Sequence, residues 1–146
     1  MTDNMGIFMN STAIENFVQA QARAVKIRPR VGGFPYLAEV LRAAGVTRNL
    51  MHLPSCHGIF LTQYGDIVIQ AAPLVQAMAD IPVFDRARLI QALRIDQAGE
   101  STFEQFLSAS WQSGVVRFEV DFVARQVVYY GCREESYVEE YPAVEV

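Results

Sequence analysis

Three side chains with nucleophilic or metal-binding chemistry lie in the segment MHLPSCHGIF: His52, Cys56 and His57. A cysteine acts as a nucleophile when a base within hydrogen-bond reach lowers its pKa. His57 follows Cys56 directly, and neighbouring side chains in extended chain point to opposite faces. In a straight strand the alpha carbons of His52 and Cys56 would lie about 13 Å apart, although Pro54 disfavours a straight strand. We therefore interpret Cys56 as a buried residue at a strand entry, with thiol catalysis as the alternative, and assign no catalytic residue.

The same side chains have the ligand types that suit zinc, and distant Cys132 could join His52, Cys56 and His57 around an ion. The spacing does not match a Cys-x-x-Cys knuckle, and Cys132 would have to come from the other half of the chain. The sequence therefore predicts no metal and no other cofactor, and it leaves His52, Cys56 and His57 as a candidate reactive or metal cluster.

A second candidate site is a basic loop that contains glycines. Four cations and a glycine pair lie close together in the sequence: Arg23, Lys26, Arg28, Arg30 and Gly32-Gly33. A helix is predicted to begin directly afterwards, and the N–H groups of a helix N-terminus attract anions. Arg28, Arg30, Gly32 and Gly33 are therefore the predicted ligand-binding residues for a phosphate or carboxylate. The alternative is a surface loop with solvated arginines, because the pattern is neither a Walker loop nor a GxGxxG fingerprint.

Helical periodicity and capping patterns predict the elements that position these residues. A first helix is expected to begin with the capping box Thr12–Glu15 and to end before Pro29. Its predicted buried stripe is Ile14, Phe17, Val18, Ala22 and Val25. A second helix runs from Pro35 to Gly45, followed by extended segments over 46–53, 59–63 and 66–71 with a tight turn at Tyr64-Gly65.

The second half of the chain repeats this order. Asp85 is predicted to cap a helix that Gly99 ends, and Ser101 with Glu104 forms a second capping box. The predicted buried faces of these two helices are Leu89, Ile90 and Leu93, then Phe103, Phe106, Leu107 and Trp111. A strand follows Gly114, with Val116, Phe118, Val120 and Phe122 on one face, and QVVYYG returns as its hairpin partner.

Two segments share one pattern, LAEVLRAAGVTRNLMHL and FLSASWQSGVVRFEVDF, in which a helix leads through Gly-Val-x-Arg into a strand. Gly45 and Arg48 correspond to Gly114 and Arg117, which places His52 opposite Asp121 on an outward-facing position. The chain order predicts an α+β fold, a mostly antiparallel sheet with helices packed on one face, built from two helix–strand–strand repeats.

Composition limits the class of protein. The chain has 146 residues, 51% of them hydrophobic, and a formal charge of −4, which disfavours binding to nucleic acid or to an anionic membrane. The N-terminus has no basic, apolar signal sequence, and two cysteines are too few for a disulfide framework, so a cytoplasmic location is expected. We predict a flexible lead-in over residues 1–10 and a single α+β domain over 11–146.

The motifs IRPRVGGFPYLAEVLRAAGV, LPSC, DQAGESTF and YYG, taken together, resemble the YbcV-like family of small uncharacterised bacterial and prophage-encoded proteins, some labelled phage envelope protein. The resemblance runs from about residue 13 to residue 146 and implies one small domain of unassigned biochemical function. We expect a non-enzymatic binding or interaction protein whose partners are a second copy of the chain or a small anionic ligand. The alternatives are an anion or nucleotide-type binder using the Arg28–Gly33 loop, and a small enzyme using Cys56 with a nearby histidine.

Overall fold

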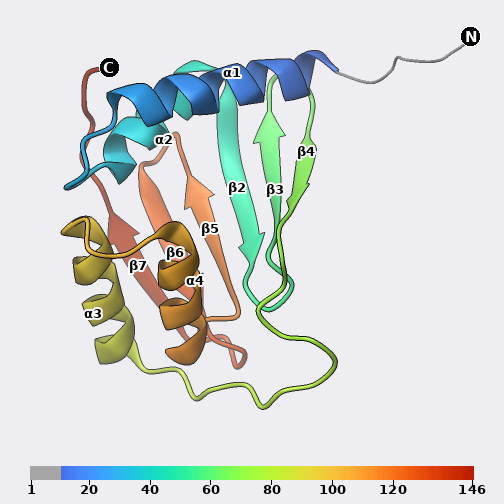
Figure 1. The fold of residues 1–146 in the computed structure, drawn as a ribbon, viewed down its shortest axis with the longest axis vertical. Helices are drawn as coiled ribbons and strands as arrows, with labels where there is room; N and C mark the ends of the chain where they lie inside the picture. The colour runs from blue at the N-terminus through green and yellow to red at the C-terminus, as the bar shows by residue number, and fades with distance from the viewer. Residues whose placement is uncertain (1–10) are drawn as a thin grey trace, which may run out of the picture.

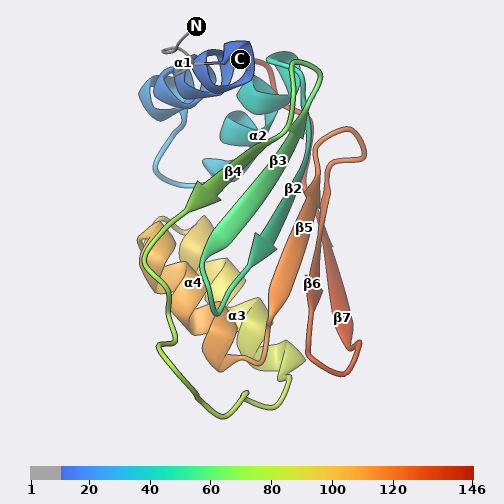
Figure 2. The ribbon, with the colours of Figure 1, turned by 90° about the vertical axis from the view of Figure 1, so that its right-hand side faces the viewer.

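The computed structural model describes residues 11–146, in which four helices lie on one face of a six-stranded antiparallel sheet (Figure 1, Figure 2). The strand order is β4-β3-β2-β5-β6-β7, so the first strand of each half of the chain lies at the centre of the sheet. The elements are α1 (Thr12–Ile27), α2 (Phe34–Ala43), β2 (Val46–His52), β3 (His57–Thr62), β4 (Ile67–Gln70), α3 (Arg86–Gln97), α4 (Phe103–Gln112), β5 (Arg117–Asp121), β6 (Gln126–Tyr130) and β7 (Ser136–Glu140). The predicted α+β class is confirmed, whereas the expected lead-in falls outside the described residues.

The repeat is real and larger than predicted, because each half contributes two helices and three strands. Gly45 and Gly114 both adopt a positive φ, 93° and 88°, directly before β2 and β5. Eleven residues further on, the last turn residues Cys56 and Arg125 again share a positive φ, 54° and 58°. The two halves therefore follow the same backbone path through the first hairpin, at a constant sequence offset.

The two halves meet at a local twofold axis between β2 and β5. Arg48 pairs with Asp121 in the register of these strands, and His52 pairs with Arg117. Since Arg48 corresponds to Arg117 and His52 to Asp121 in the repeat, each of these pairs is the image of the other. Leu50 pairs with Glu119, its own counterpart, so the axis passes through that pair.

Helix boundaries follow side-chain caps, two of which differ from the predicted ones. Ser11 caps α1 by accepting a hydrogen bond from the Ile14 N–H, one residue earlier than expected. The capping box of α4 is Thr102 with Gln105, one residue later than the predicted Ser101–Glu104 pair. In both cases the neighbouring residue carries the same kind of acceptor, so sequence alone leaves the start of the helix uncertain by one position.

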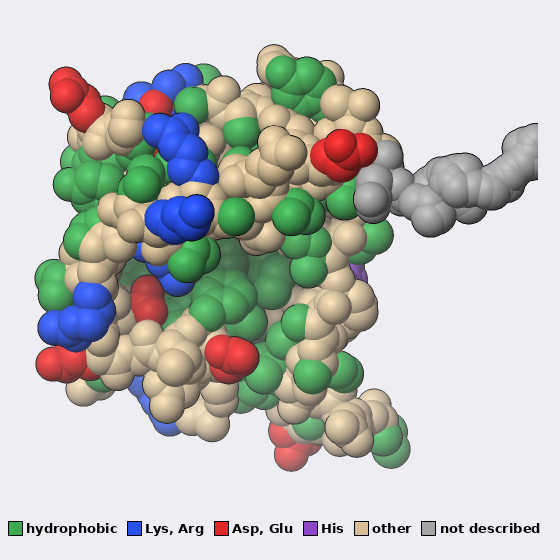
Figure 3. Space-filling view, turned by 45° about the horizontal axis from the view of Figure 1, so that its top comes forward, with side chains coloured by type: hydrophobic (Ala, Val, Ile, Leu, Met, Phe, Trp, Pro, Cys, Tyr) green, Lys and Arg blue, Asp and Glu red, His purple; other side chains and the backbone are tan. Residues whose placement is uncertain are grey.

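The buried stripe of α1 is rotated from the predicted one. Its buried residues are Ala13, Phe17, Ala20 and Ala24. Val18 and Val25 are 56% and 65% exposed, and Phe103 at the start of α4 is 59% exposed, which contradicts their predicted burial. Alanines let α1 approach its neighbours closely, whereas the bulkier valines lie on its flank. Figure 3 shows a hollow with apolar side chains on the helix-bearing side of the molecule.

The sheet has one covered and one open face. Phe118, Val120, Val127 and Tyr129 are buried beneath the helices, as the alternation of β5 predicted. Among residues 11–146, no helix lies on the opposite face, and the strand register arranges its side chains in three rows across the sheet. The lower row is Gln70, His57, His52, Arg117, Tyr130 and Ser136; the middle row is Val68, Ile59, Leu50, Glu119, Val128 and Val138; the upper row is Leu61, Arg48, Asp121, Gln126 and Glu140.

Candidate ligand-binding cavity

The lower row concentrates the histidines and an arginine on adjacent strands. His52 pairs with His57 on β3 and with Arg117 on β5, so all three side chains lie on the open face. The two imidazole rings stack with their centroids 4.7 Å apart and their planes 20° from parallel. The prediction from the repeat that His52 points outward is confirmed, because its side chain is exposed.

Arg117 is held in place by two neighbours on the same face. Its guanidinium carbon lies 3.8 Å from the centroid of the Tyr130 ring, and its Nη1 donates to a Glu119 carboxylate oxygen at 2.6 Å. A guanidinium has five N–H donors in a planar fork, so this arrangement leaves donors free for a second acceptor. Arg117 is therefore an oriented cation beside the His52 imidazole.

An open cavity of about 510 Å³, broadly exposed to solvent, adjoins this row at the lower end of the sheet. Its size falls in the range of small-ligand sites, roughly 300–1,000 Å³. Four segments distant in sequence form it: the end of β2 and the following turn, the connection after β4, the start of β5 and the turn after β6. The lining residues are His52, Pro54, Ser55, Ile81, Val116, Arg117, Gly131, Cys132 and Glu134.

The connection between β4 and α3, residues 71–85, contains no helix or strand and supplies one wall. Hydrogen bonds tie down its two ends: the Leu74 N–H donates to the Pro54 carbonyl, and the Asp85 N–H donates to the Ser113 carbonyl. Between these anchors Ile81 borders the cavity, while Met78 is 93% exposed. Structureless connections of this length inside a domain are uncommon and are often functional.

Backbone strain is concentrated beside the cavity. Glu134 in its lining has a φ of 68°, and Cys56, next to the lining residue Ser55, has a φ of 54°. Such left-handed conformations cost non-glycine residues on the order of 1–3 kcal/mol and gather at ligand sites. Ser55 also binds the Nδ1 of His57 through its hydroxyl at 2.7 Å, which fixes the orientation of that imidazole.

His52 is the titratable group most affected by this environment. Although much of the side chain is exposed, partial desolvation of the ring lowers its pKa below the ordinary value of 6.5, and the charges of His57 and Arg117 lower it further. The imidazole is therefore neutral near pH 7 and can either donate or accept a hydrogen bond. An anion bound beside it would favour the protonated form.

The cysteines differ from each other in exposure and chemistry. Cys56 is buried, its thiol donates to the Leu53 carbonyl at 3.3 Å, and burial raises its pKa. Cys132 is exposed and lines the cavity together with His52. Among residues 11–146, no group of three or more His, Cys, Asp or Glu side chains is placed to hold a metal ion.

The basic loop, the other predicted site, makes contacts that join the two halves of the molecule. The Gly32 N–H donates to the Gln97 carbonyl at 2.9 Å, and Arg30 donates to the Gly99 carbonyl at 3.0 Å. Gly33 is the N-cap of α2, and a Cβ there would lie 2.4 Å from the Pro29 carbonyl oxygen. Arg28 is exposed and lowers the pKa of Asp96 by its charge, although burial outweighs this effect and raises that pKa.

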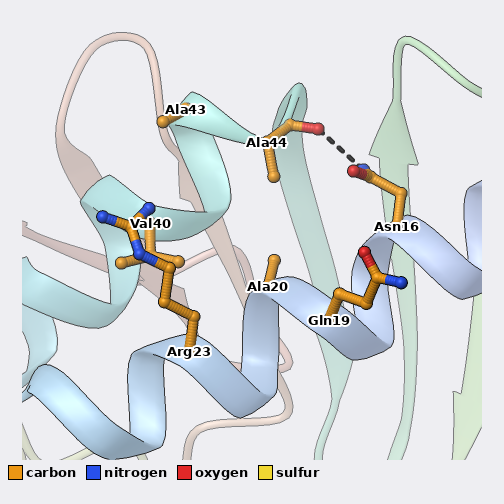
Figure 4. Close-up of a pocket in the computed structure, with 7 residues that line it drawn as sticks. All are labelled: Asn16, Gln19, Ala20, Arg23, Val40, Ala43 and Ala44. Carbon is orange, nitrogen blue, oxygen red and sulfur yellow. Dashed lines mark hydrogen bonds between the residues drawn. The ribbon is translucent and has the colours of Figure 1, made fainter.

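A smaller hollow of about 210 Å³ lies between α1 and α2 (Figure 4). Arg23, Gln19 and Asn16 project from α1 along it, and alanines of both helices form much of the remaining wall. Asn16 already donates to the Ala44 carbonyl at 2.8 Å, near the end of α2. This groove is thus a close helix contact with a structural hydrogen bond, and we assign no ligand to it.

Sequence reasoning missed the cavity because its residues come from separate turns. The repeat indicated that Arg117 and His52 share the open face, but not that they are cross-strand neighbours. The long stretch 71–85 lacks helical or strand periodicity, and this was the one signal in the sequence for a functional connection. Nothing in the sequence placed Cys132 and Glu134 beside it.

Comparisons with known proteins identify the family without assigning an activity. Within residues 11–146, no helix has both the length and the apolar character needed to cross a bilayer. The chain is 44% identical over 135 residues to the uncharacterized protein Rv2012 of Mycobacterium tuberculosis and to the uncharacterized protein Mb2035 of Mycobacterium bovis. Each alignment covers 92% of this chain and 82% of the relative. Residues 23–140 match the family model described as a protein of unknown function, DUF1398, and the chain belongs to that family.

Proposed function

We propose that this protein is a non-enzymatic binding protein that holds a small organic monoanion, with a carboxylate head and an apolar body, in the cavity beside Arg117. The observation that carries the proposal is the oriented guanidinium of Arg117 next to His52 at the mouth of a cavity of about 510 Å³. An arginine fork matches a planar carboxylate in a bidentate geometry.

The lining favours a single negative charge. Arg117 and His52 offer donors to the anionic head, while Ile81, Val116 and Pro54 offer apolar surface to the rest of the ligand. Glu134 and the neighbouring Glu119 repel a second negative charge. A polyphosphate or nucleic acid therefore suits the cavity less well than a monocarboxylate does.

The burial of Cys56 argues against thiol catalysis. Its thiol is 3% exposed and has a raised pKa, so the reactive thiolate is scarce near neutral pH. In the folded protein we expect iodoacetamide to alkylate exposed Cys132 far faster than Cys56, as measured by peptide mass spectrometry. Alkylation of Cys56 at the faster rate would restore the thiol-enzyme alternative.

Titration calorimetry and NMR of the two imidazoles test the ligand site with acetate, hexanoate and pyrophosphate as probes. We expect hexanoate to bind with a dissociation constant on the order of 1 mM or tighter, and more tightly than either other probe. Arg117→Gln should weaken hexanoate binding by about tenfold or more, because it removes a charge-assisted hydrogen-bond pair.

Arg48→Gln is the matched control, since Arg48 occupies the same position in the other repeat and borders no described cavity. It should leave hexanoate binding unchanged. The proposal fails if about 20 mM hexanoate leaves both imidazole signals unmoved, or if the two arginine variants weaken binding equally.

The Arg28–Gly33 loop is a weaker anion site, because Arg30 and the Gly32 N–H already bind carbonyl groups of the other half. Loss of hexanoate binding on Arg28→Gln, with Arg117→Gln unaffected, would favour that loop. The resemblance to YbcV-like proteins further suggests a prophage-encoded, cytoplasmic protein. We expect phage genes to flank its gene, and we expect the protein to be recovered from the soluble fraction of lysed cells.

A further inference from the structure

The open face of the sheet carries an apolar row, and none of the four helices in the described part of the chain covers it. Five of the six side chains in the middle row are apolar, with Glu119 as the exception. Val68 and Val138 near its two ends are 68% and 48% exposed. Charged and polar residues dominate the rows above and below it. An apolar stripe between polar rims is the usual arrangement of a protein interface.

We infer that two copies of the chain associate face to face through this surface, with the middle row of one copy lying along the middle row of the other. The inference is argued from the open face and does not require the proposed ligand, although both involve Arg117, so its test is made without organic anions. A closed dimer of identical chains has a twofold axis, so each copy uses the same patch.

The match between apolar side chains, together with charge complementarity, selects the direction of that axis. A twofold along the middle row places the lower row of each copy over the upper row of the other. On β5 this brings Arg117 of one copy over Asp121 of the second copy, and the reverse contact forms as well. A twofold parallel to the strands would also form a charge pair between the copies, Arg48 over Asp121, but it would place the Glu119 carboxylate of each copy over Leu50 of the other and His52 over Arg117. It therefore matches fewer apolar side chains of the middle row.

The one like-charge contact near the preferred axis is moderated within each copy. The two Glu119 side chains approach each other there, and each carboxylate already accepts a hydrogen bond from its own Arg117 at 2.6 Å. The paired guanidinium offsets the repulsion between the carboxylates. The side chains of Leu50 and Val128, on either side of Glu119, supply apolar contact around it.

The area of the face sets the strength of the association. Six strands about 4.8 Å apart, with five residues each at about 3.4 Å, give a projected face of roughly 500 Å² per copy. Specific stable interfaces bury about 800 Å² of accessible surface on each partner, so this face lies at the lower end. We therefore expect a reversible dimer with a dissociation constant in the micromolar range.

Sedimentation velocity over a series of protein concentrations, in a buffer without organic anions, tests the inference. The wild-type chain should shift with concentration from 16.4 kDa towards twice that mass. The double variant Val68→Lys, Val138→Lys should weaken self-association by at least about a hundredfold, because charges enter the apolar row of both copies. Both valines are exposed within one copy, so the double variant should still fold, as circular dichroism will verify.

Val25→Lys is the control, since Val25 on α1 is 65% exposed and lies on the helix-bearing side. It should dimerise like the wild-type chain. A wild-type chain that stays at 16.4 kDa up to about 200 μM, or a double variant that dimerises normally, overturns the inference. Loss of the dimer in Val25→Lys but not in the double variant would assign self-association to α1 and would equally overturn it.

Discussion

The two ends of the central β2–β5 strand pair occupy equivalent positions in the repeat, but the arginine at each end makes different contacts. At the upper end, Arg48 lies 3.5 Å from the carboxylate of Asp121. At the lower end, the equivalent arginine, Arg117, faces His52 instead of a carboxylate. Arg117 consequently turns to Glu119 on its own strand and to the ring of Tyr130.

This difference shows how one replacement in a symmetric framework can leave a cation available. Asp121 pairs with Arg48 and also accepts hydrogen bonds from the Val123 and Ala124 N–H groups, which hold the β5–β6 turn. A neutral imidazole at the equivalent position cannot neutralise Arg117. The lower end also borders the cavity, because the 71–85 connection and the turn after β6 meet there. The proposed ligand site therefore lies at the lower end.

The largest effect expected from a single substitution concerns the covered side of the same strands. Phe118 is 6% exposed and packs on the Tyr129 ring at 5.6 Å, whereas its repeat counterpart Asn49 donates to the Ile59 carbonyl. Phe118→Ala should lower the free energy of unfolding by about 3–5 kcal/mol, and Asn49→Ala by only about 1 kcal/mol. Urea denaturation measures both. Equal losses would mean that the two halves pack alike despite their sequences.

The second largest effect, on ligand binding, is expected when the cross-strand pair at the lower end is changed to match the one at the upper end. His52→Asp should place a carboxylate across from Arg117 and recreate the Arg48–Asp121 arrangement. Hexanoate binding should then weaken by about tenfold or more, because the new carboxylate competes for the guanidinium and repels the ligand. His52→Asn, of similar size and uncharged, is the control. If hexanoate binds His52→Asp normally, the contrast between the two ends does not explain binding.

The paired turn residues should respond to glycine with opposite signs. Arg125 and Cys56 share a left-handed backbone conformation, which glycine adopts without strain. Arg125→Gly should raise the free energy of unfolding by less than about 1 kcal/mol, because relief of the backbone strain outweighs loss of the partly exposed ion pair with Glu39 at 3.6 Å. Cys56→Gly should lower it by about 1 kcal/mol, because a buried side chain is lost. Thermal unfolding followed by circular dichroism distinguishes the two signs, and destabilisation by Arg125→Gly would contradict the strain argument.

The smallest expected effect is a pH dependence specific to the lower end. The folded protein lowers the pKa of His52 below 6.5, so the unfolded chain binds more protons in the window just below that value. This contribution to stability is therefore present above about pH 6.5 and is lost as the pH falls. Urea denaturation between pH 8 and pH 5.5 should show a slope that His52→Gln reduces. An unchanged slope in that variant would assign the pH dependence to other groups.

Much of the fold could be predicted from local sequence. The cap at Asp85, the helix ends near Pro29 and Gly99, and the alternation around Phe118 depend on neighbouring residues alone. The Gly-Val-x-Arg pattern also revealed the repeat, because Gly45 and Gly114 each adopt a positive φ before a strand. Such signals are short in range, and they hold whichever element packs nearby.

Contacts between residues that are distant in sequence were decided by the tertiary structure. The buried face of α1 is the one that carries its alanines, because small side chains allow neighbouring elements to approach closely. Periodicity alone could not show that Val18 and Val25 are exposed. The basic loop has the composition of an anion site, and only the packed structure shows that the Gln97 and Gly99 carbonyls lie against two of its donors. The cavity depends on the antiparallel pairing of β2 with β5, which brings His52 beside Arg117. Sequence fixes the face on which each of these side chains lies, whereas the strand register, a property of the packed sheet, selects its neighbour.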